Sequence, residues 1–505
     1  MTTFEARSPL TGQTIKVFEE AGEDDVRRAM DRARRAFASW KDRSVEERVS
    51  FVRGLKRAIL RDMDGIVRRI VEATGKVELE AQSSDVLATL EVIQYCEDHA
   101  AEVLATEKRP ASLIFMGASC FVEYRPMGVV AVFSPWNYPF QLAMVPLVSA
   151  LVAGNAVILK PSEVTPTVGE IIESLCLKAE LPRDVVQVVQ GGRDAGQRLI
   201  RAMPDKIFFT GSLATGRKIM EAAARGPIPV DLELSGKDPM IVFDDANLER
   251  AANAAVFGAF ANAGQACVAI ERCYVQGGIY EAFVEAVVKK TKRLRVGRGP
   301  DADIGAIISP RQIEIIDDHV HDAVARGARL LAGGILEASF YRPVILADVT
   351  HEMKVMREET FGPVLPILRF STEDEAVALA NDSEYGLNAS VFSGDLARAR
   401  RVAARLVVGN CAVNDVSLNI ANAFAPFGGV KRSGFGKSHG PEGLRAFCHQ
   451  VSVLVSPGRL KRQPYYFPYS RRTVTLTRKL MQVLYGDRKI LKPVKPLLDL
   501  LTRLG

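Results

Sequence analysis

The stretch 127–159 contains no Asp, Glu, Lys or Arg, and it constrains the fold more than any other part of this 505-residue chain. An uncharged run of this length could span a bilayer. Chain-breaking residues interrupt it, however, at Pro135, Asn137, Pro139, Pro146, Gly154 and Asn155. We therefore interpret it as a buried strand at 129–133, a loop, a buried helix near 140–153 and a second strand at 156–159.

The same alternation of short apolar strands and longer helices continues along the chain. The segment 24–40 carries its apolar residues on one helical face, and 185–189 is a short β-branched run. Further along, the pattern predicts a strand at 239–243, a helix at 248–263 and a strand at 272–275. Such alternation predicts an α/β protein with two Rossmann-like parallel-sheet domains, and the length of the chain also favours more than one domain.

Polar loops follow the predicted strands of the first half, and binding residues usually lie in such loops. The amide of Asn137 can donate to a developing oxyanion. Lys160 and Glu163 can bind sugar hydroxyls, and a carboxylate there favours a free 2′-hydroxyl over a 2′-phosphate. Gly211 and Ser212 stand where a helix starts, and backbone amides at that position can bind a pyrophosphate. Taken singly, these residues fit an ordinary turn or a surface ion pair equally well.

Cys267 and Glu233 form the candidate catalytic pair. Cys267 follows the small-residue run Gly-Gln-Ala, and Glu233 begins Glu-Leu-Ser-Gly-Lys. A thiolate attacks electrophilic carbon, and a carboxylate can activate the thiol or a later water. A single cysteine is more often buried and inert. The seven cysteines contain no C-x-x-C, so we expect neither a disulfide framework nor a metal site, and a reducing compartment suits a working thiolate.

The chain resembles the NAD(P)-dependent aldehyde dehydrogenases, because seven motifs of that family occur in the family's order between about residues 5 and 450. They are P-W-N-Y-P-F, A-G-N-A-V-I-L-K-P-S-E, F-T-G-S, L-E-L-S-G-K, G-Q-A-C, E-E-T-F-G-P-V at 358–364 and P-F-G-G-V-K-R-S-G-F-G at 426–436. Each motif is weak alone, whereas the ordered set identifies Cys267 as the expected nucleophile.

The resemblance implies a covalent mechanism of aldehyde oxidation. Cys267 attacks the aldehyde to form a thiohemiacetal, and Asn137 with the backbone N–H of Cys267 holds the oxyanion. Hydride transfer to nicotinamide leaves a thioester, and Glu233 activates the water that hydrolyses it. Gly236 and Lys237 are expected to belong to the loop of Glu233.

The resemblance also implies the cofactor site, with NAD expected in preference to NADP. Lys160 and Glu163 would hold the adenosine ribose, and Gly211 and Ser212 would lie near the pyrophosphate. The remaining cofactor residues would surround the nicotinamide end, where Glu359 holds the ribose and aromatic side chains lie close by: Trp136 and Phe361.

Ser235 and Glu271 lie close to the candidate catalytic pair in the sequence, and we make a separate prediction for each. Ser235 stands where the family pattern L-E-L-G-G-K has its first glycine, so a positive φ at this position would be mildly strained. Glu271 follows Cys267 by four residues, and we expect it to form an ion pair with Arg272 rather than to act as a second base.

The domain organisation is predicted from the motifs and the alternation together. We expect an NAD-binding domain at 1–107 and 128–235 and a catalytic domain at 236–439, with Glu233 and Cys267 flanking the cleft between them. By resemblance, 108–127 and 440–455 form an oligomerisation arm that pairs strands between subunits of a homodimer or homotetramer.

A basic extension at 456–505 follows the arm. Residues 455–505 carry twelve Lys or Arg against two Asp, a net charge of +10 in a chain whose total is +6. Interleaved aromatic residues and leucines favour an anionic membrane surface, and the alternatives are a segment docked on a neighbouring subunit and a solvated tail. No nucleic-acid-binding fold accompanies the charge, so nucleic acid is not expected. The N-terminus lacks a signal peptide, and we expect a cytoplasmic enzyme with peripheral membrane association.

The substrate prediction is based on the exact residues found in the motifs. P-W-N-Y-P-F, P-F-G-G-V with the nearby Ser438-His439-Gly440, and the extension resemble the fatty aldehyde branch of the family. The opening Ser8-Pro9-Leu10-Thr11-Gly12 is more typical of tetrameric branches. We expect a medium- to long-chain or isoprenoid-like aldehyde, and the alternatives are a polar semialdehyde, a CoA-acylating reaction and a non-catalytic scaffold. Glu233 argues against CoA acylation, which normally lacks the hydrolytic carboxylate.

Overall fold

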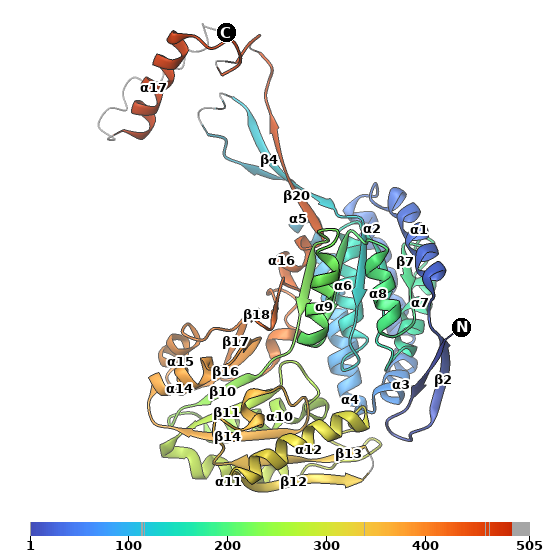
Figure 1. The fold of residues 1–505 in the computed structure, drawn as a ribbon, viewed down its shortest axis with the longest axis vertical. Helices are drawn as coiled ribbons and strands as arrows, with labels where there is room; N and C mark the ends of the chain where they lie inside the picture. The colour runs from blue at the N-terminus through green and yellow to red at the C-terminus, as the bar shows by residue number, and fades with distance from the viewer. Residues whose placement is uncertain are drawn as a thin grey trace. The chain divides into compact units, whose positions relative to one another are not determined.

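The computed structural model describes residues 2–112, 115, 117–337, 339–459, 461–463 and 465–486 (Figure 1). The chain forms two compact units. One contains the residues up to Ala105 together with Tyr124–Gln450, and the other contains Thr106–Glu123 and the chain from Val451 onward. Residues 487–505 of the predicted extension lie outside the described residues.

A six-stranded sheet forms the first half of the larger unit, in the order β19-β9-β8-β5-β6-β7. Its neighbouring strands are parallel except for β19, which pairs antiparallel with β9. The strands are β5 (Val129–Phe133), β6 (Ala156–Lys160), β7 (Val186–Val188), β8 (Lys206–Thr210), β9 (Val230–Glu233) and β19 (Gly434–Phe435).

Helices cover both faces of this sheet, which explains why its central strands β5, β6 and β8 are buried along their whole length. Along β5, Val129, Ala131 and Phe133 join one apolar cluster, whereas Val130 and Val132 join another. The first cluster contains residues of α1 (Glu23–Trp40), α8 (Arg193–Arg201) and α9 (Leu213–Ala223). The second contains residues of α2 (Val45–Arg61), α3 (Met63–Thr74), α5 (Ala88–Val103), α6 (Gln141–Val152) and α7 (Thr167–Lys178). The uncharged stretch is therefore a strand, a buried helix and a strand, as predicted.

A seven-stranded sheet forms the second half, in the order β12-β13-β14-β11-β10-β16-β17. All its neighbours are parallel except β12 and β13. The strands are β10 (Asp238–Val242), β11 (Ile270–Gln276), β12 (Arg329–Glu337), β13 (Phe340–Ala347), β14 (Val364–Phe370), β16 (Asn388–Phe392) and β17 (Asn410–Val413). The predicted fold class, with two parallel-sheet α/β domains, is confirmed.

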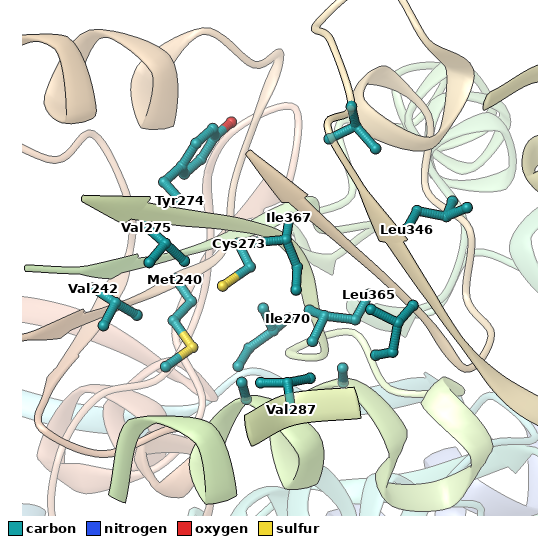
Figure 2. Packing of buried hydrophobic residues seen from close by; sticks show 14 of the residues in the cluster. Met240, Val242, Ile270, Cys273, Tyr274, Val275, Val287, Leu346, Leu365 and Ile367 are labelled. Atoms are coloured by element: carbon teal, nitrogen blue, oxygen red, sulfur yellow. The ribbon is translucent and has the colours of Figure 1, made fainter. Parts of the chain in front are cut away.

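The core of this second sheet is apolar and closely packed. Figure 2 shows Cys273 among Met240, Ile270 and Ile367, and all four side chains are buried. The helices of this half are α10 (Leu248–Phe260), α11 (Tyr280–Thr291), α12 (Pro310–Ala325), α13 (Lys354–Arg357), α14 (Glu373–Asn381) and α15 (Leu396–Ala403). Because Cys273 is enclosed by hydrocarbon, it behaves as a small core residue and not as a nucleophile.

Shorter elements complete the larger unit and position the site. They are β1 (Thr3–Arg7), β2 (Thr14–Glu19), α4 (Glu78–Glu80), the π-helix η1 (Ala81–Leu87), η3 (Ala261–Gly264), η4 (Gly277–Ile279), β15 (Tyr385–Gly386), η5 (Leu418–Ala421), β18 (Val430–Lys431) and α16 (Gly440–Arg445). The chain returns to the first sheet at β19, where Gly434 pairs with Glu233 and Phe435 with Leu232. This return brings residues after 433 beside the end of β9.

Among its described residues, the smaller unit has no buried hydrophobic side chain. A three-stranded sheet in the order β20-β4-β3 links β20 (Cys448–Val455), β4 (Ser119–Pro126) and β3 (Glu107–Arg109). The helix α17 (Arg471–Tyr485) follows and has no buried residue. In the part of the chain that the structure describes, no helix is both long enough and apolar enough to cross a membrane.

Candidate active site

A cavity of about 310 Å³ gathers most of the predicted site residues. It is lined by Trp136, Asn137, Gly211, Ser212, Glu233, Cys267, Glu359 and Phe361, with Thr210, Leu142 and Ser235 also contributing. Lys160 and Glu163 do not line it. The cavity lies wholly within the larger compact unit.

The turn before Cys267 has a strained backbone held by close packing. Asn262 and Ala263 have φ of 55° and 56°, a region that non-glycine residues rarely occupy. Gly264 follows with φ of +71°, and a Cβ on it would lie 2.2 Å from the carbonyl oxygen of Gly362. Glycine is therefore required at 264, because the turn packs directly on the backbone after Phe361.

Cys267 is partly exposed, and its surroundings keep the thiol protonated at rest. Burial of the sulfur raises its pKa well above the usual value, and the nearby carboxylates of Glu233, Asp238 and Glu359 raise the pKa further. A thiolate beside three carboxylates is electrostatically unfavourable. The nucleophile therefore needs a base when substrate arrives.

Asn137 is buried, and both its side-chain amide and its backbone carbonyl form hydrogen bonds. Its Nδ2 donates to the carbonyl of Gln265 at 3.1 Å. Its own carbonyl accepts from Lys76 Nζ at 2.8 Å and from Asn262 Nδ2 at 3.1 Å. The amide thus faces the turn that carries Cys267, as an oxyanion donor would.

Lys76 belongs to a buried ion pair that sequence reasoning missed. Lys76 Nζ lies 2.6 Å from Asp85 Oδ2, and both side chains are fully buried. Asp85 Oδ1 also accepts from the backbone amides of Phe140 and Gln141 at 3.1 and 3.2 Å. The pair therefore ties the Asn137 loop and the start of α6 to the segment 76–85, and no motif in that segment predicts the contact.

Glu233 ends β9 and accepts a hydrogen bond from a residue distant in sequence. Ser438 Oγ donates to Glu233 Oε1 at 2.7 Å, and both residues are buried. Burial is the main reason why the pKa of Glu233 is raised to about 7, and the charge of Asp231 raises the pKa further. The Ser438 hydroxyl and the charge of Lys437 act in the opposite direction and lower the pKa. A carboxyl with this pKa can exchange a proton near neutral pH.

Glu359 lies beside the backbone that follows Glu233. The amide of Gly236 donates to Glu359 Oε1 at 3.0 Å. Burial raises the pKa of Glu359 to about 7, and the Ser235 hydroxyl and the Gly236 amide lower it by hydrogen bonding. Ser235 is not among the described non-glycine residues with positive φ, so the strain considered for it does not arise.

Glu271 lies in an ion pair, as predicted, but its partner is not the neighbouring Arg272. Glu271 pairs with Lys237, with 2.5 Å between Oε2 and Nζ, and both side chains are buried. Arg272 instead donates to the carbonyls of Lys237, Leu379 and Ala380. Successive residues of a strand point to opposite faces, so Glu271 and Arg272 cannot easily meet on β11.

Five of the predicted cofactor residues, Trp136, Lys160, Glu163, Gly211 and Ser212, stand at or just after the carboxyl ends of neighbouring parallel strands. Because β8, β5 and β6 are adjacent, the loops carrying Gly211, Trp136 and Lys160 lie on one edge of the sheet, where α/β proteins bind nucleotides. Lys160 Nζ lies 3.3 Å from Glu163 Oε2, whose side chain is half exposed.

These residues fit a bound NAD(P). The buried hydroxyl of Thr210, at the cavity wall, has no hydrogen-bond partner in the structure, and Glu163 offers an exposed carboxylate oxygen. The rings of Trp136 and Phe361 meet edge to face with centroids 5.5 Å apart. Among the described residues, no group of three His, Cys, Asp or Glu is arranged to hold a metal ion.

Comparisons with known proteins agree with this geometry. Residues 1–453 match the model of the aldehyde dehydrogenase family. The chain is 45% identical over 493 residues to a 4,4'-diapolycopene aldehyde oxidase of Methylomonas sp, covering 97% of this chain and 93% of that protein. It is 37% identical over 453 residues to a Mycobacterium tuberculosis protein named as a succinate-semialdehyde dehydrogenase (NADP+) 2, covering 88% and 87%.

Solved structures give the same result. An aldehyde dehydrogenase from Brucella melitensis biovar abortus superposes with a TM-score of 0.87 at 34% identity, covering 90% of this chain and 94% of that one. A betaine aldehyde dehydrogenase from Staphylococcus aureus in complex with NAD+ superposes with a TM-score of 0.85 at 31% identity, covering 91% and 94%. The family model and these similarities establish that the chain belongs to the aldehyde dehydrogenase family.

Proposed function

We propose that this aldehyde dehydrogenase oxidises a long, apolar aldehyde to its carboxylic acid with NAD, through a covalent intermediate on Cys267. The observation that carries the proposal is the convergence of Cys267, Asn137 and Glu233 on one cavity. The three groups supply a nucleophile, an amide donor and a base, which is the set that oxidation of an aldehyde to an acid requires.

The first step forms the bond between Cys267 Sγ and the aldehyde carbon. The thiol proton passes to a base as sulfur attacks, and Glu233 with its pKa of about 7 is the carboxylate available. The carbonyl electron pair moves to oxygen, where the amide of Asn137 and the backbone N–H of Cys267 stabilise the charge. Asn137 Nδ2 uses one hydrogen on Gln265, which leaves the second for the oxyanion.

The second half of the reaction releases the acid. Bound NAD supplies the oxidising power by accepting the hydride from the former aldehyde carbon. Cys267 then holds the acyl group as a thioester. Glu233, which has released the thiol proton to solvent, takes a proton from the water that attacks this thioester. The carbon–sulfur bond breaks and the thiol is restored. Glu233 also argues against CoA acylation, in which CoA replaces this water.

Apolar walls beside the nucleophile favour a hydrophobic substrate. Val268 and Phe427 belong to a small apolar cluster against which Cys267 and Ile420 pack. Leu142 adds to the cavity lining, and no Lys or Arg is among the described residues that line it. A substrate with a second carboxylate would find no cation there, so a succinate semialdehyde, suggested by the mycobacterial relatives, is the weaker alternative.

The extent of the similarities supports the same substrate class. The family model ends at residue 453, before the basic extension. The alignment to the 4,4'-diapolycopene aldehyde oxidase covers 97% of this chain. The uncovered 3% is shorter than the extension 456–505, so the alignment includes part of the extension. We therefore favour a carotenoid-like or other long isoprenoid aldehyde, in keeping with the predicted fatty or isoprenoid class.

NAD is the proposed cofactor, although relatives use either dinucleotide. Glu163 presents a half-exposed carboxylate beside Lys160. A negative charge at the adenosine ribose repels a 2′-phosphate and accepts a hydrogen bond from a free 2′-hydroxyl. Lys160, which is buried, holds Glu163 in place.

A homodimer or homotetramer is proposed from the smaller unit. In the sheet β20-β4-β3, strands β20 and β3 are both edges in the described part of the chain. Most of β20 is exposed, and its backbone groups on the open side can pair with a strand of another subunit.

The nucleophile is tested by Cys267→Ala, with Cys120→Ala as the matched control because Cys120 is also partly exposed and lies in the other unit. We expect Cys267→Ala to lose NADH formation while NAD binding, followed by calorimetry, stays unchanged. Cys120→Ala should keep full activity. Substantial aldehyde oxidation by purified Cys267→Ala would contradict the assignment.

Ser438 is expected to set the pH dependence of Glu233. Activity should fall as pH drops through about 7, where Glu233 becomes protonated. Ser438→Ala removes a hydrogen bond that lowers this pKa, so the acid limb of kcat should move up by about one pH unit or less. Ser438→Thr keeps the hydroxyl and should restore the limb.

Glu233→Gln tests directly whether Glu233 is the base whose pKa the pH experiment follows. Stopped-flow measurements should show one burst of NADH followed by turnover slowed roughly 10²–10⁴-fold, because the thioester waits for an unactivated water. An acid limb that is unmoved in Ser438→Ala, or unchanged turnover in Glu233→Gln, would place the base elsewhere.

Cofactor choice is tested by Glu163→Ser, with Glu163→Asp as a control that keeps the charge. The wild type should prefer NAD in kcat/KM. Glu163→Ser should narrow that preference at least about tenfold, since the charge that repels the 2′-phosphate is gone. Equal kcat/KM for NAD and NADP in the wild type would refute the role of Glu163.

The substrate class is tested with a panel of saturated and polyene aldehydes of increasing length, together with succinate semialdehyde. NADH absorbance and acid product are measured for each. We expect kcat/KM to rise about fourfold per added methylene that the cavity buries. A maximum at succinate semialdehyde would overturn the apolar assignment.

A further inference from the structure

Helix α17 (Arg471–Tyr485) has an apolar side that the described chain covers only in part. Leu476, Leu480, Val483 and Leu484 recur at the spacing that places residues on one side of a helix. None of these residues is buried, and Val474, Met481 and Tyr485 beside them are 55%, 52% and 76% exposed. A side this wide and this apolar requires a hydrophobic partner.

The opposite side of α17 carries all four basic residues of the helix and no acidic one. Arg471, Arg472, Arg478 and Lys479 fall together on the arc that the apolar residues leave free. Between 456 and 486 the chain contains seven Lys or Arg and no Asp or Glu. A helix with one leucine-rich side and one basic side matches those that lie in the plane of a membrane interface.

An aromatic run precedes the helix. Tyr465, Tyr466, Phe467 and Tyr469 are 58%, 52%, 77% and 64% exposed. Aromatic side chains with a polar tip gather at the level of lipid headgroups, because one end is apolar and the other is wet. The aromatic run and the helix are therefore neighbours in sequence, and both carry residues suited to a membrane interface.

We propose that α17 and the aromatic run before it dock this enzyme on an anionic lipid bilayer. Arginine and lysine contact the negatively charged headgroups, and the leucine side and the aromatic rings enter the boundary with the acyl chains. The inference rests on the proposed function, and it deepens it: a long apolar aldehyde dissolves in the bilayer, so an enzyme attached there meets its substrate at high local concentration.

Charge and apolar pattern together distinguish this partner from others. A nucleic acid would match the basic side but would leave the leucine side in water. A second subunit would match the leucine side but has no need of an acid-free basic arc. The bilayer satisfies both sides of the helix at once, and the helix is too short and too charged to span it.

Vesicle co-sedimentation of the full-length protein tests the proposal. The probes are phosphatidylcholine vesicles with about 30% phosphatidylserine and vesicles of phosphatidylcholine alone. We expect sedimentation with the anionic vesicles at about 0.05 M salt and a steep loss at about 0.5 M, because salt screens the headgroup charge. Vesicles of phosphatidylcholine alone should bind far less.

Two matched variants assign the binding to α17. The first reverses the basic arc, with Arg471→Glu, Arg472→Glu, Arg478→Glu and Lys479→Glu. The second keeps the charge, with Arg471→Lys, Arg472→Lys, Arg478→Lys and Lys479→Arg. Reversal should lower the partition coefficient at least about a hundredfold, whereas the charge-preserving variant should bind as the wild type does.

NADH formation from a water-miscible aldehyde is measured in the same samples. Equal activity in all three proteins shows that the variants are folded and keeps the result separate from the proposed function. The proposal is overturned if the wild type does not sediment with anionic vesicles at low salt, or if charge reversal leaves the sedimentation unchanged. A change in oligomeric state on reversal, without vesicle binding by the wild type, would identify α17 as a subunit contact instead.

Discussion

The buried ion pair between Lys237 and Glu271 is the interaction on which the active site depends most. The carboxylate of Glu271 neutralises Lys237 and also accepts hydrogen bonds from the backbone amides of Thr360 and Phe361. The N···O distances are 2.8 to 3.2 Å. One carboxylate thereby joins the loop after Glu233 to the loop that carries Glu359. Removing one partner of such a pair leaves an uncompensated buried charge, which typically costs about 3–5 kcal/mol. The positions of these two loops of the candidate site thus depend on a pair that has no role in the proposed reaction.

Backbone contacts without side chains complete that arrangement. A Cβ at Gly236 would lie 2.4 Å from the carbonyl oxygen of Cys267, and one at Gly264 would overlap the backbone at Gly362. The three loops therefore touch through main-chain atoms, which leaves little freedom for adjustment. The second buried pair, Lys76 with Asp85, fixes the Asn137 loop in the same way from the other side.

Carboxylates give the cavity its electrostatic character. Burial holds both Glu233 and Glu359 at pKa values of about 7, and their charge raises the pKa of the Cys267 thiol. Burial of the sulfur is the larger cause of that rise, so the thiol form is favoured at rest, and the thiolate is the reactive form. Ser438 moderates the effect by stabilising the charged form of Glu233, so the base remains usable near neutral pH.

The sequence by itself determined the local elements, and it predicts the reacting groups. Apolar runs bounded by proline and glycine predict β5, α6 and β6 because hydrophobic periodicity is a property of neighbouring residues, and ordered motifs identify Cys267, Glu233 and Asn137. Only the tertiary structure decided how those groups are held. The Ser438–Glu233 bond joins residues 205 positions apart, and Lys76 reaches Asn137 across 61. Such contacts depend on strand order and on the return of the chain at β19, which no local pattern encodes. The partner of Glu271 was mispredicted for the same reason: adjacency in sequence suggested Arg272, whereas the alternation of side chains along a strand directs the two residues to opposite faces.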